Sequence, residues 1–178
     1  MSATPIFTFG HGTADAAEIA TLLTGAGVQR LVDVRSAPGS RHNPDSARDA
    51  MAGWLPEAGI AYQWESRLGG WRRVNGESPD TGLRVESFRS YAAHMRTTEF
   101  RTAIDELLAT AALEQIAVMC AETVWWRCHR RMIADYLTLV RGVEVRHLMH
   151  DGKLRPHRPI PEARVDGDVL IYDGAPPD

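Results

Sequence analysis

Short apolar runs alternate with helix-like patterns along most of this chain. The runs that predict β-strands lie at residues 6–9, 31–35, 60–64, 116–120 and 143–148. Between most of these runs, apolar side chains recur at the three- and four-residue spacing of amphipathic helices. Strands that alternate with helices form a parallel sheet, and right-handed crossovers place the helices on both of its faces. We therefore expect an α/β fold built on a single Rossmann-like parallel sheet.

Local signals predict where some of these elements begin and end. Asp15, with Glu18 three residues later, resembles a capping box, and Gly27 ends the helix that follows. After the fourth strand, an amphipathic pattern over residues 126–140 predicts a further helix. Near the C-terminus, the apolar run at 169–172 predicts an edge strand.

Size and composition fit one domain over residues 1–178. The chain has 178 residues, and its 44% hydrophobic content is enough to build a core. From residue 151 onward it becomes a C-terminal extension rich in proline and charge. No apolar run approaches the roughly 20 residues that cross a bilayer, and the N-terminus lacks a signal-peptide pattern. We therefore expect a cytoplasmic protein that makes no membrane contact.

Chemically reactive side chains gather in the strand, loop and helix predicted over residues 116–140. This stretch holds both cysteines of the chain, together with a glutamate and a histidine. In a parallel sheet, ligands bind at the carboxyl ends of the strands, where this loop would lie. Counting back four residues from Ile133 places the histidine on the buried stripe of the helix. The candidate catalytic residues are Cys120, Glu122, Cys128 and His129.

Candidate anion-binding residues come from segments that end at the same edge of the sheet. Gly10 and Gly12 would let backbone N–H groups approach an anion, and His11 lies between them. Asp33 and Arg35 share one face of their strand, where they belong either to the site or to a local ion pair. The complete set of anion-binding candidates is Gly10, His11, Gly12, Asp33, Arg35, Arg41, Asn43, Arg127 and Arg130.

Five motifs of the chain resemble those of one known family. They are Gly10-His11-Gly12-Thr13, Leu31-Val32-Asp33-Val34-Arg35-Ser36, Arg41-x-Asn43-Pro44, Leu68-Gly69-Gly70, and Met119-Cys120-Ala121-Glu122 followed by Cys128-His129-Arg130. Over residues 5–150 the chain is similar to the bacterial "domain of unknown function 488" family. Members of that family commonly have Gly-His-Ser where this chain has Gly-His-Gly, so a hydroxyl is missing near the anion site. The family has no established activity, and the resemblance implies a fold and a site but no reaction.

The first interpretation of this crevice is an enzyme. Cys120 or Cys128 would be a thiolate nucleophile, or Glu122 a general base, and arginines would hold a small phosphorylated or nucleotide-like substrate. A thiolate at a helix N-terminus among arginines is stabilised by the helix dipole and by the neighbouring cations. This interpretation predicts that the two sulfur atoms lie close together and that Arg35 and Arg130 form walls of the anion site.

Two other interpretations remain open at this point. Cys120, Cys128 and His129, with His11 or Glu122, would suit zinc, although their spacing matches no standard zinc module. Alternatively, the pair at residues 125–126, both tryptophan, would stack on bases or on a partner protein in a non-catalytic binding module. The net charge of −3 favours a small anionic ligand over nucleic acid. The sequence identifies no cofactor and no oligomeric state.

Overall fold

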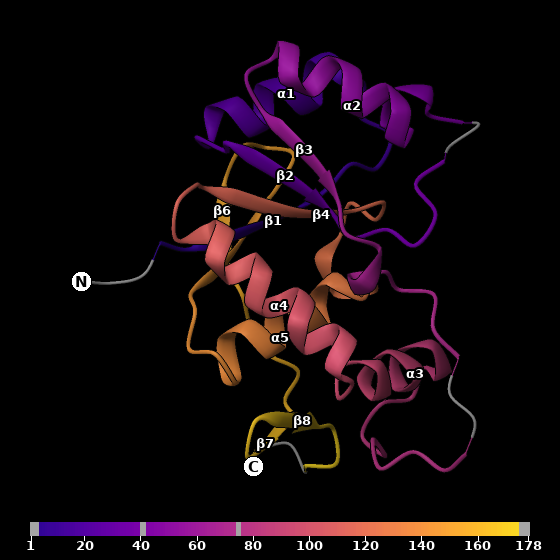
Figure 1. The fold of residues 1–178 in the computed structure, drawn as a ribbon. Coiled ribbons are helices and arrows are strands. Elements are labelled where there is room, and N and C mark those ends of the chain that lie inside the picture. Colours follow the sequence, from indigo (N-terminus) through magenta and orange to yellow (C-terminus); the bar gives the residue numbers. More distant parts are fainter. Residues whose placement is uncertain (1–3, 40–41, 74–75, 175–178) are drawn as a thin grey trace.

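The computed structural model describes residues 4–39, 42–73 and 76–174, and it places six strands of that part of the chain in one sheet (Figure 1). The order across the sheet is β3-β2-β4-β1-β5-β6. The strands are β1 (Ile6–Gly10), β2 (Arg30–Asp33), β3 (Ala61–Trp64), β4 (Ile116–Cys120), β5 (Val145–Leu148) and β6 (Leu154–Pro156). Strands β1 to β5 pair in parallel, and β6 pairs antiparallel with β5. The predicted α/β fold with a mostly parallel sheet is confirmed.

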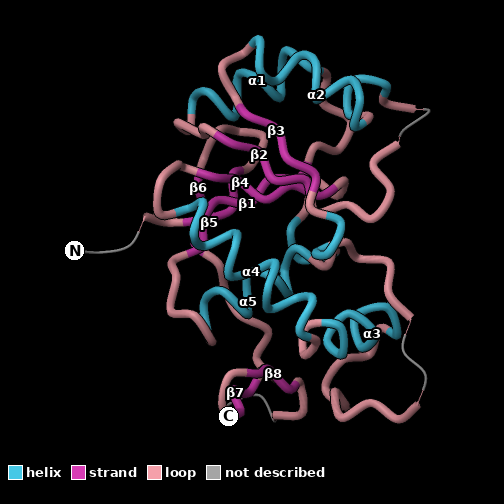
Figure 2. The backbone as a smooth tube through the Cα atoms, viewed as in Figure 1, coloured by secondary structure: helices cyan, strands magenta, loops and turns pink. Residues whose placement is uncertain are grey.

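Within the described residues, five α-helices cover the sheet on its two sides. They are α1 (Ala16–Gly25), α2 (Arg48–Glu57), α3 (Glu86–His94), α4 (Thr98–Ala111) and α5 (Arg130–Leu139). Figures 1 and 2 show α1 and α2 on one side of the sheet, and α3, α4 and α5 on the other. Three short 3-10 turns, η1 (Pro44–Ser46), η2 (Ser66–Leu68) and η3 (Trp125–Arg127), lie in the loops.

The core is divided by the sheet because alternate residues of a strand point to opposite faces. In β4, Ala117 and Met119 belong to the cluster that packs against α1 and α2. Ile116 and Val118 belong to the cluster that packs against α3, α4 and α5. The residues of both clusters are buried, and their close packing fixes the positions of the strands. The side chains at the carboxyl ends of the strands are thereby held in place.

The local signals at the first helix are confirmed. The side chain of Asp15 accepts a hydrogen bond from the backbone N–H of Glu18, at 2.9 Å. Gly27 has a φ of +76°, which is the left-handed conformation expected one residue beyond a helix end. The sequence was sufficient to predict these helix ends, because the residues that form each of them lie within a few positions of each other.

The helix predicted over residues 126–140 begins later than expected. Trp125–Arg127 forms the separate turn η3, and Cys128 has an extended backbone with a φ of −136° and a ψ of 167°. That extended residue prevents one continuous helix, so α5 starts at Arg130 with His129 as its N-cap. The break places Cys128 outside the helix and leaves its side chain free to turn towards β4.

The C-terminal extension also differs from the prediction. Residues 169–172 were expected to add an edge strand to the sheet, but β8 (Val169–Ile171) pairs with β7 (Arg164–Asp166) in a separate hairpin. The edge strand next to β5 is β6, which ends in Pro156. Proline is tolerated at a sheet edge, and a three-residue strand with one aliphatic side chain gives no periodic signal. Among the described residues, no helix is long and apolar enough to traverse a bilayer.

Candidate functional site

A cavity of about 490 Å³ lies at the carboxyl ends of β1, β2 and β4. In that position a parallel sheet usually binds its ligand. Four loops contribute, namely those after β1, β2 and β3 and the one that joins β4 to α5, and helix α3 adds two residues. The lining residues are His11, Arg35, Ser36, Ala37, Gly39, Gly70, Trp71, Ser87, Phe88, Cys120, Ala121, Glu122, Arg127, Cys128 and His129.

The two cysteines meet at this cavity. Cys120 is the last residue of β4, Cys128 directly precedes the helix cap, and their sulfur atoms are 2.7 Å apart. Both side chains are buried, with residue exposures of 2% and 8% respectively, and both are free thiols. The predicted approach of the two sulfur atoms is therefore confirmed. The strand end and the extended backbone at Cys128 together produce it.

The surroundings shift the pKa values of the two thiols in opposite directions. Burial alone would raise the pKa of Cys120, but the hydrogen bond from Cys128 and the positive charge of Arg130 lower this pKa to about 7. Burial raises the pKa of Cys128 well above its ordinary value, and the neighbouring Cys120 adds to this increase. Of the two thiols, Cys120 is therefore the one that ionises first, near pH 7, while Cys128 remains a thiol that donates a hydrogen bond to it.

Arg130 lies beneath the cysteines and is the largest completely buried side chain among the described residues. Its guanidinium donates to the hydroxyl of Thr8 at 2.9 Å and to the carbonyl oxygens of Glu122 at 2.9 Å and Thr123 at 3.3 Å. Within the described part of the chain, no carboxylate forms an ion pair with it. This positive charge is one of the causes that lower the pKa of Cys120.

Arg130 does not form a wall of the cavity, contrary to the prediction. It was expected to face a bound anion because it follows Cys128 in the sequence motif. Its side chain instead runs inward from the first turn of α5 to Thr8 on β1, where it is fully covered. Arg130 therefore acts on the site through the electrostatic potential at Cys120.

A chain of hydrogen bonds extends from Arg130 through the core. Thr8 Oγ1 lies 2.5 Å from His147 Nδ1, and His147 Nε2 lies 2.9 Å from His157 Nδ1. His157 Nε2 lies 2.7 Å from a carboxylate oxygen of Asp135, which is completely buried. We call Thr8, His147, His157 and Asp135 the buried relay.

Each hydrogen bond along the buried relay is donated in the direction from Arg130 towards Asp135. Arg130 has only N–H donors, so Thr8 accepts from it and donates its own hydrogen to His147. The opposite ring nitrogen of His147 then donates to His157, which donates to Asp135. Burial, together with the charges on His157 and Arg130, lowers the pKa of His147 to about 2, so its imidazole is neutral. The relay thus connects a buried cation to a buried carboxylate.

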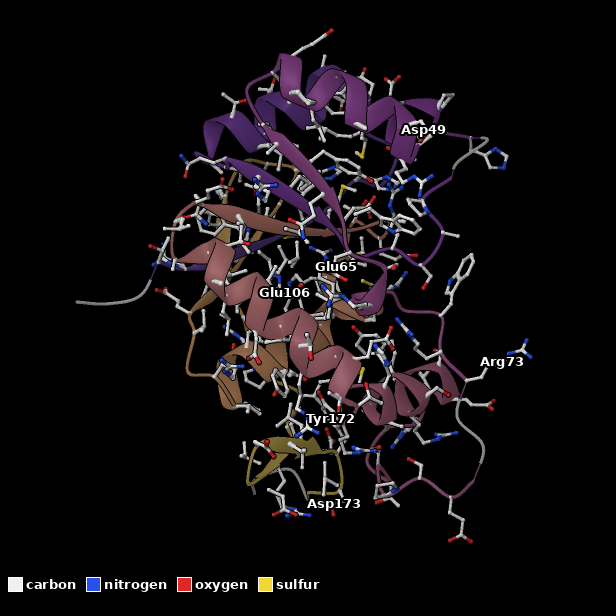
Figure 3. All side chains as sticks on the ribbon, viewed as in Figure 1. Asp49, Glu65, Arg73, Glu106, Tyr172 and Asp173 are labelled. Carbon is white, nitrogen blue, oxygen red and sulfur yellow. The ribbon has the colours of Figure 1, made fainter. Side chains whose placement is uncertain are left out.

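Aromatic and phenolic groups cover the buried relay. The ring of Trp125 stacks on the ring of His147, with centroids 4.3 Å apart and an angle of 4° between the planes. The hydroxyl of Tyr172 donates to the second oxygen of Asp135 at 2.9 Å. Tyr172, labelled in Figure 3, belongs to the C-terminal extension, which therefore completes the surroundings of the relay.

On the opposite side of the cavity, Arg35 is paired with a carboxylate. Its guanidinium contacts both oxygens of Asp33, at 2.8 and 2.7 Å, and the carbonyl oxygen of Ser46 at 2.7 Å. A further N–H donates to His11 Nε2 at 3.1 Å. Four of the five N–H donors of Arg35 are thereby used, and one hydrogen of Nη1 remains for a ligand. The predicted ion pair with Asp33 is confirmed.

His11 is held as a neutral acceptor. Its Nδ1 donates to the carbonyl oxygen of Gly12 at 2.9 Å, so Nε2 accepts from Arg35. Burial lowers the pKa of His11, and the charge of Arg35 contributes to this decrease. His11 thus lies in the cavity wall as expected, although β4 separates β1 from β2 in the sheet.

Gly10 and Gly12 do not supply donors to an anion, contrary to the prediction. The backbone N–H of Gly12 donates to the carbonyl oxygen of Ala121 at 2.9 Å. A Cβ on Gly10 would lie 1.7 Å from the carbonyl oxygen of Glu122. Gly10 lies in β1, and both glycines serve the close packing of the first loop against the loop after β4. Glycine patterns indicate close approach, but they do not identify what approaches.

The loop after β3 closes another side of the cavity. Ser36 Oγ accepts from the backbone N–H of Trp71 at 2.8 Å, and a Cβ on Gly70 would lie 2.6 Å from His129 Nδ1. Arg67 pairs with Glu65 and with Glu106 of α4, two carboxylates labelled in Figure 3. These contacts hold the Leu68-Gly69-Gly70 motif against the site.

His129 is held by contacts with the backbone after β2 and with α3. Its Nε2 donates to the carbonyl oxygen of Val34 at 2.7 Å, and its ring meets the edge of Tyr91 at 5.1 Å. Burial lowers the pKa of His129 to about 4, so the ring is neutral near pH 7. Among the described residues, no three Cys, His, Asp or Glu side chains are arranged to hold a metal ion. The zinc interpretation is therefore not supported.

The remaining candidates lie at the rim or outside it. Glu122 and Arg127 are exposed and line the cavity. Asn43 donates to the carbonyl oxygens of Gly12 and Ala14, at 3.3 and 3.0 Å, and thereby ties two loops together. Arg41 lies outside the described residues.

Sequence reasoning missed the buried relay. Thr8 and Asp135 did carry a signal, since each is a polar residue at a position surrounded by apolar ones. Their partners His147 and His157 come from β5 and the segment after β6, and the pattern of the chain does not show that these segments meet.

One comparison with known proteins agrees with the family motifs of the sequence. The model of the family described as "Domain of unknown function DUF488" matches residues 15–137, which is more than half of the chain. The chain belongs to this family, as its motifs predicted. Searches of curated proteins and of solved structures returned no match. The matched region contains the cysteines, Arg35 and Arg130, but it excludes Thr8, His147 and His157 of the buried relay.

Proposed function

We propose that this protein is an enzyme in which the Cys120 thiolate is the nucleophile for a small anionic substrate bound in the cavity. The observation that supports this most is Arg130, a completely buried cation beside a thiol, with no carboxylate paired to it in the described chain. Catalytic cysteines depend on such electropositive surroundings, whereas structural cysteines are inert in apolar ones. The hydrogen bond from Cys128 adds to the stabilisation of the thiolate.

The shape and charge of the cavity favour a phosphorylated or nucleotide-like substrate. A volume of about 490 Å³ suits a small molecule. One N–H of Arg35 and the guanidinium of Arg127 are available to an anion, since Arg127 forms no ion pair with any described residue. The backbone N–H groups of Ala121 and Glu122 also find no protein acceptor among the described residues. The residues that carry these donors line the same cavity as Cys120.

In the proposed reaction, Cys120 Sγ forms a bond to an electrophilic atom of the substrate. The leaving group departs with the electron pair of the broken bond and takes a proton from water. Glu122, which is exposed at the rim of the same cavity, would act as a general base. We further propose a Rossmann-like class for the sheet, and a cytoplasmic location in which both thiols stay reduced.

A non-catalytic binding module is less well supported. It required that Trp125 and Trp126 both be available for stacking, but Trp125 is stacked on His147. Of this pair only Trp126 is exposed, and it does not line the cavity. Among the described residues, Trp71 is the one exposed tryptophan that lines the cavity, and one ring does not form the series of stacking platforms that single-stranded nucleic acids use.

The test is the pH dependence of cysteine alkylation by iodoacetamide, with the modified residue identified by mass spectrometry. We expect Cys120 to react with an apparent pKa of about 7, and phosphate or AMP to slow the reaction by occupying the cavity. Arg127→Ala should weaken this protection about ten-fold, as expected for one lost charge-assisted hydrogen bond. Arg158→Ala is a matched control, because Arg158 is exposed and does not line the cavity. An ordinary thiol pKa at Cys120, without anion protection, would overturn the proposal.

A further inference from the structure

The contact between the cysteines has a chemical consequence of its own. Their sulfur atoms are 2.7 Å apart, and the length of a disulfide bond is about 2.05 Å. Both sulfur-bearing residues line one cavity, so a small reagent that reaches one also reaches the other. No rearrangement of the sheet is needed to join them, because Cys120 ends β4 and Cys128 belongs to no helix or strand.

We propose that Cys120 and Cys128 form a reversible oxidation site, at which a small hydroperoxide converts the two thiols into an intramolecular disulfide. The site goes beyond the nucleophilic reaction proposed above, since it requires no anionic substrate. The reagent class is a hydroperoxide such as hydrogen peroxide. The reductant that restores the site is a low-molecular-weight thiol.

The first step oxidises Cys120. Its thiolate attacks one oxygen of the hydroperoxide, a sulfur–oxygen bond forms, and the oxygen–oxygen bond breaks. The other oxygen leaves with the electron pair and takes a proton from water, so water or an alcohol is released. The sulfur loses two electrons and becomes a sulfenic acid, and the hydroperoxide is reduced.

The second step joins the two cysteines. The sulfur of Cys128 attacks the sulfur of Cys120, a sulfur–sulfur bond forms, and the sulfur–oxygen bond breaks. The hydroxide that leaves combines with the proton of Cys128 to form water. Two molecules of a small thiol then reduce the disulfide by exchange, becoming a disulfide themselves and restoring both cysteines.

The surroundings give the two cysteines different roles in this sequence. Cys120 reacts first because it carries the thiolate beside Arg130. The negative charge of Cys120 is one cause that holds the pKa of Cys128 high, and Arg130 acts in the opposite direction. Once Cys120 becomes an uncharged sulfenic acid, that cause disappears, while burial still raises the pKa of Cys128 and Arg130 still lowers it. The attack of Cys128 therefore depends mainly on the 2.7 Å approach of the two sulfur atoms.

The connection between the cysteines can follow the small movement that the bond requires. Residues 121–124 form neither helix nor strand, and the 3-10 turn η3 is the regular element that precedes Cys128. Residues 121–123 are exposed, so the loop can adjust without displacing the core. The oxidised protein has no Cys120 thiolate, and the nucleophilic reaction proposed above would stop until a thiol restores it.

The test uses the reduced full-length protein and an equimolar amount of hydrogen peroxide, followed by mass spectrometry without reductant. We expect the wild type to lose two hydrogen atoms and to yield one linked peptide pair containing Cys120 and Cys128. In Cys128→Ser, Cys120 should stop at sulfenic acid, which dimedone traps. In Cys120→Ser, oxidation of Cys128 should be at least ten-fold slower, because burial, the largest cause of its raised pKa, is unchanged in that variant. Dithiothreitol should restore the wild type.

Some outcomes would overturn the inference. One is a wild type that accumulates sulfinic acid on Cys120 without any disulfide, and another is equal oxidation rates in the two serine variants. Circular dichroism shows whether each variant folds, and the wild-type product alone decides the result if one does not. A disulfide without anion protection of Cys120 would reject only the proposed function. Anion protection without a disulfide would reject only this inference.

Discussion

Two buried arginines lie on opposite sides of the cavity, and their partners differ. Arg35 is paired with both oxygens of Asp33, so its charge is neutralised and its remaining donors orient His11 and face the cavity. Arg130 has a hydroxyl and two carbonyl oxygens as partners, so its charge is not neutralised by a carboxylate in the described chain. Arg35 forms a wall of the cavity, whereas the charge of Arg130, with the larger effect of the hydrogen bond from Cys128, lowers the pKa of the Cys120 thiol.

This difference suggests that the absence of a carboxylate is itself functional. A buried guanidinium without an ion pair is costly, and natural proteins usually pair it. Here Asp135, the nearest buried carboxylate along the hydrogen bonds, is held away from Arg130 by Thr8 and two histidines. A carboxylate in direct contact with Arg130 would compete with the thiolate for its charge.

The comparison is tested most severely by removing each arginine. Arg35→Met leaves the completely buried Asp33 without its cation, and we expect this to cost about 3–5 kcal/mol of unfolding free energy. Arg130→Met should instead raise the pKa of Cys120 by about one unit from about 7, and this should slow its alkylation at pH 7 by about five-fold. Urea unfolding and alkylation rates measure the two effects. The comparison fails if both variants show the same pattern.

A substitution that separates the loop after β1 from the loop after β4 should have the next largest effect on stability. In Gly10→Ala, the new Cβ would meet the carbonyl oxygen of Glu122, which is backbone and cannot rotate away. We expect the free energy of unfolding to fall by about 3 kcal/mol or more. Gly25→Ala is the matched control, because a Cβ there meets nothing within 4 Å. Equal urea midpoints in the two variants would show that the two loops are not packed as described.

Acid should weaken the fold through the buried neutral histidines. The pKa of His147 is lowered to about 2 and that of His129 to about 4, from an ordinary 6.5. The unfolded chain therefore binds more protons below pH 6.5, and stability falls as the pH decreases from 6.5 towards 4. Each histidine contributes up to about 1.4 kcal/mol per pH unit. Urea unfolding from pH 7 to 5 measures this slope.

Two variants separate the histidines from other acid effects. His147→Gln should reduce the slope, since it removes one buried imidazole. His42→Gln should leave the slope unchanged, because His42 is exposed. A slope that is the same in the wild type and in His147→Gln would mean that the imidazole of His147 is not kept neutral by the fold.

The sequence predicted features that depend on residues close together in the chain, and it mispredicted features that depend on contacts between distant segments. The capping residue Asp15 and the approach of Cys120 to Cys128 were predictable, because each follows from one local strand, loop or helix end. The roles of Gly10 and Arg130 were mispredicted, since the groups they contact come from a different loop or strand. An amino-acid pattern shows that a glycine or a charge is present, but its partner is determined by the tertiary fold.

A smaller effect is expected where the buried relay meets Arg130. Thr8→Val keeps the shape of the side chain but leaves Arg130 and His147 without the hydroxyl, at a cost of about 1–3 kcal/mol. Thr8→Ser keeps the hydroxyl and serves as the control. If the relay positions Arg130, Thr8→Val also slows Cys120 alkylation at pH 7, whereas Thr8→Ser preserves the rate. The same alkylation profile in both variants would limit the relay to a role in stability.

The smallest effect is expected at His129, although it lines the cavity directly beside the cysteines in sequence. Its Nε2 hydrogen is used by the carbonyl oxygen of Val34, and its pKa of about 4 makes it a poor proton acceptor near pH 7. In His129→Gln, the amide can donate the same hydrogen bond, so the pH profile of Cys120 alkylation should stay within about two-fold of the wild type. A shift of the profile by one pH unit or more would show that this imidazole activates the thiol. The charge of Arg130 would then not be sufficient to explain the thiolate.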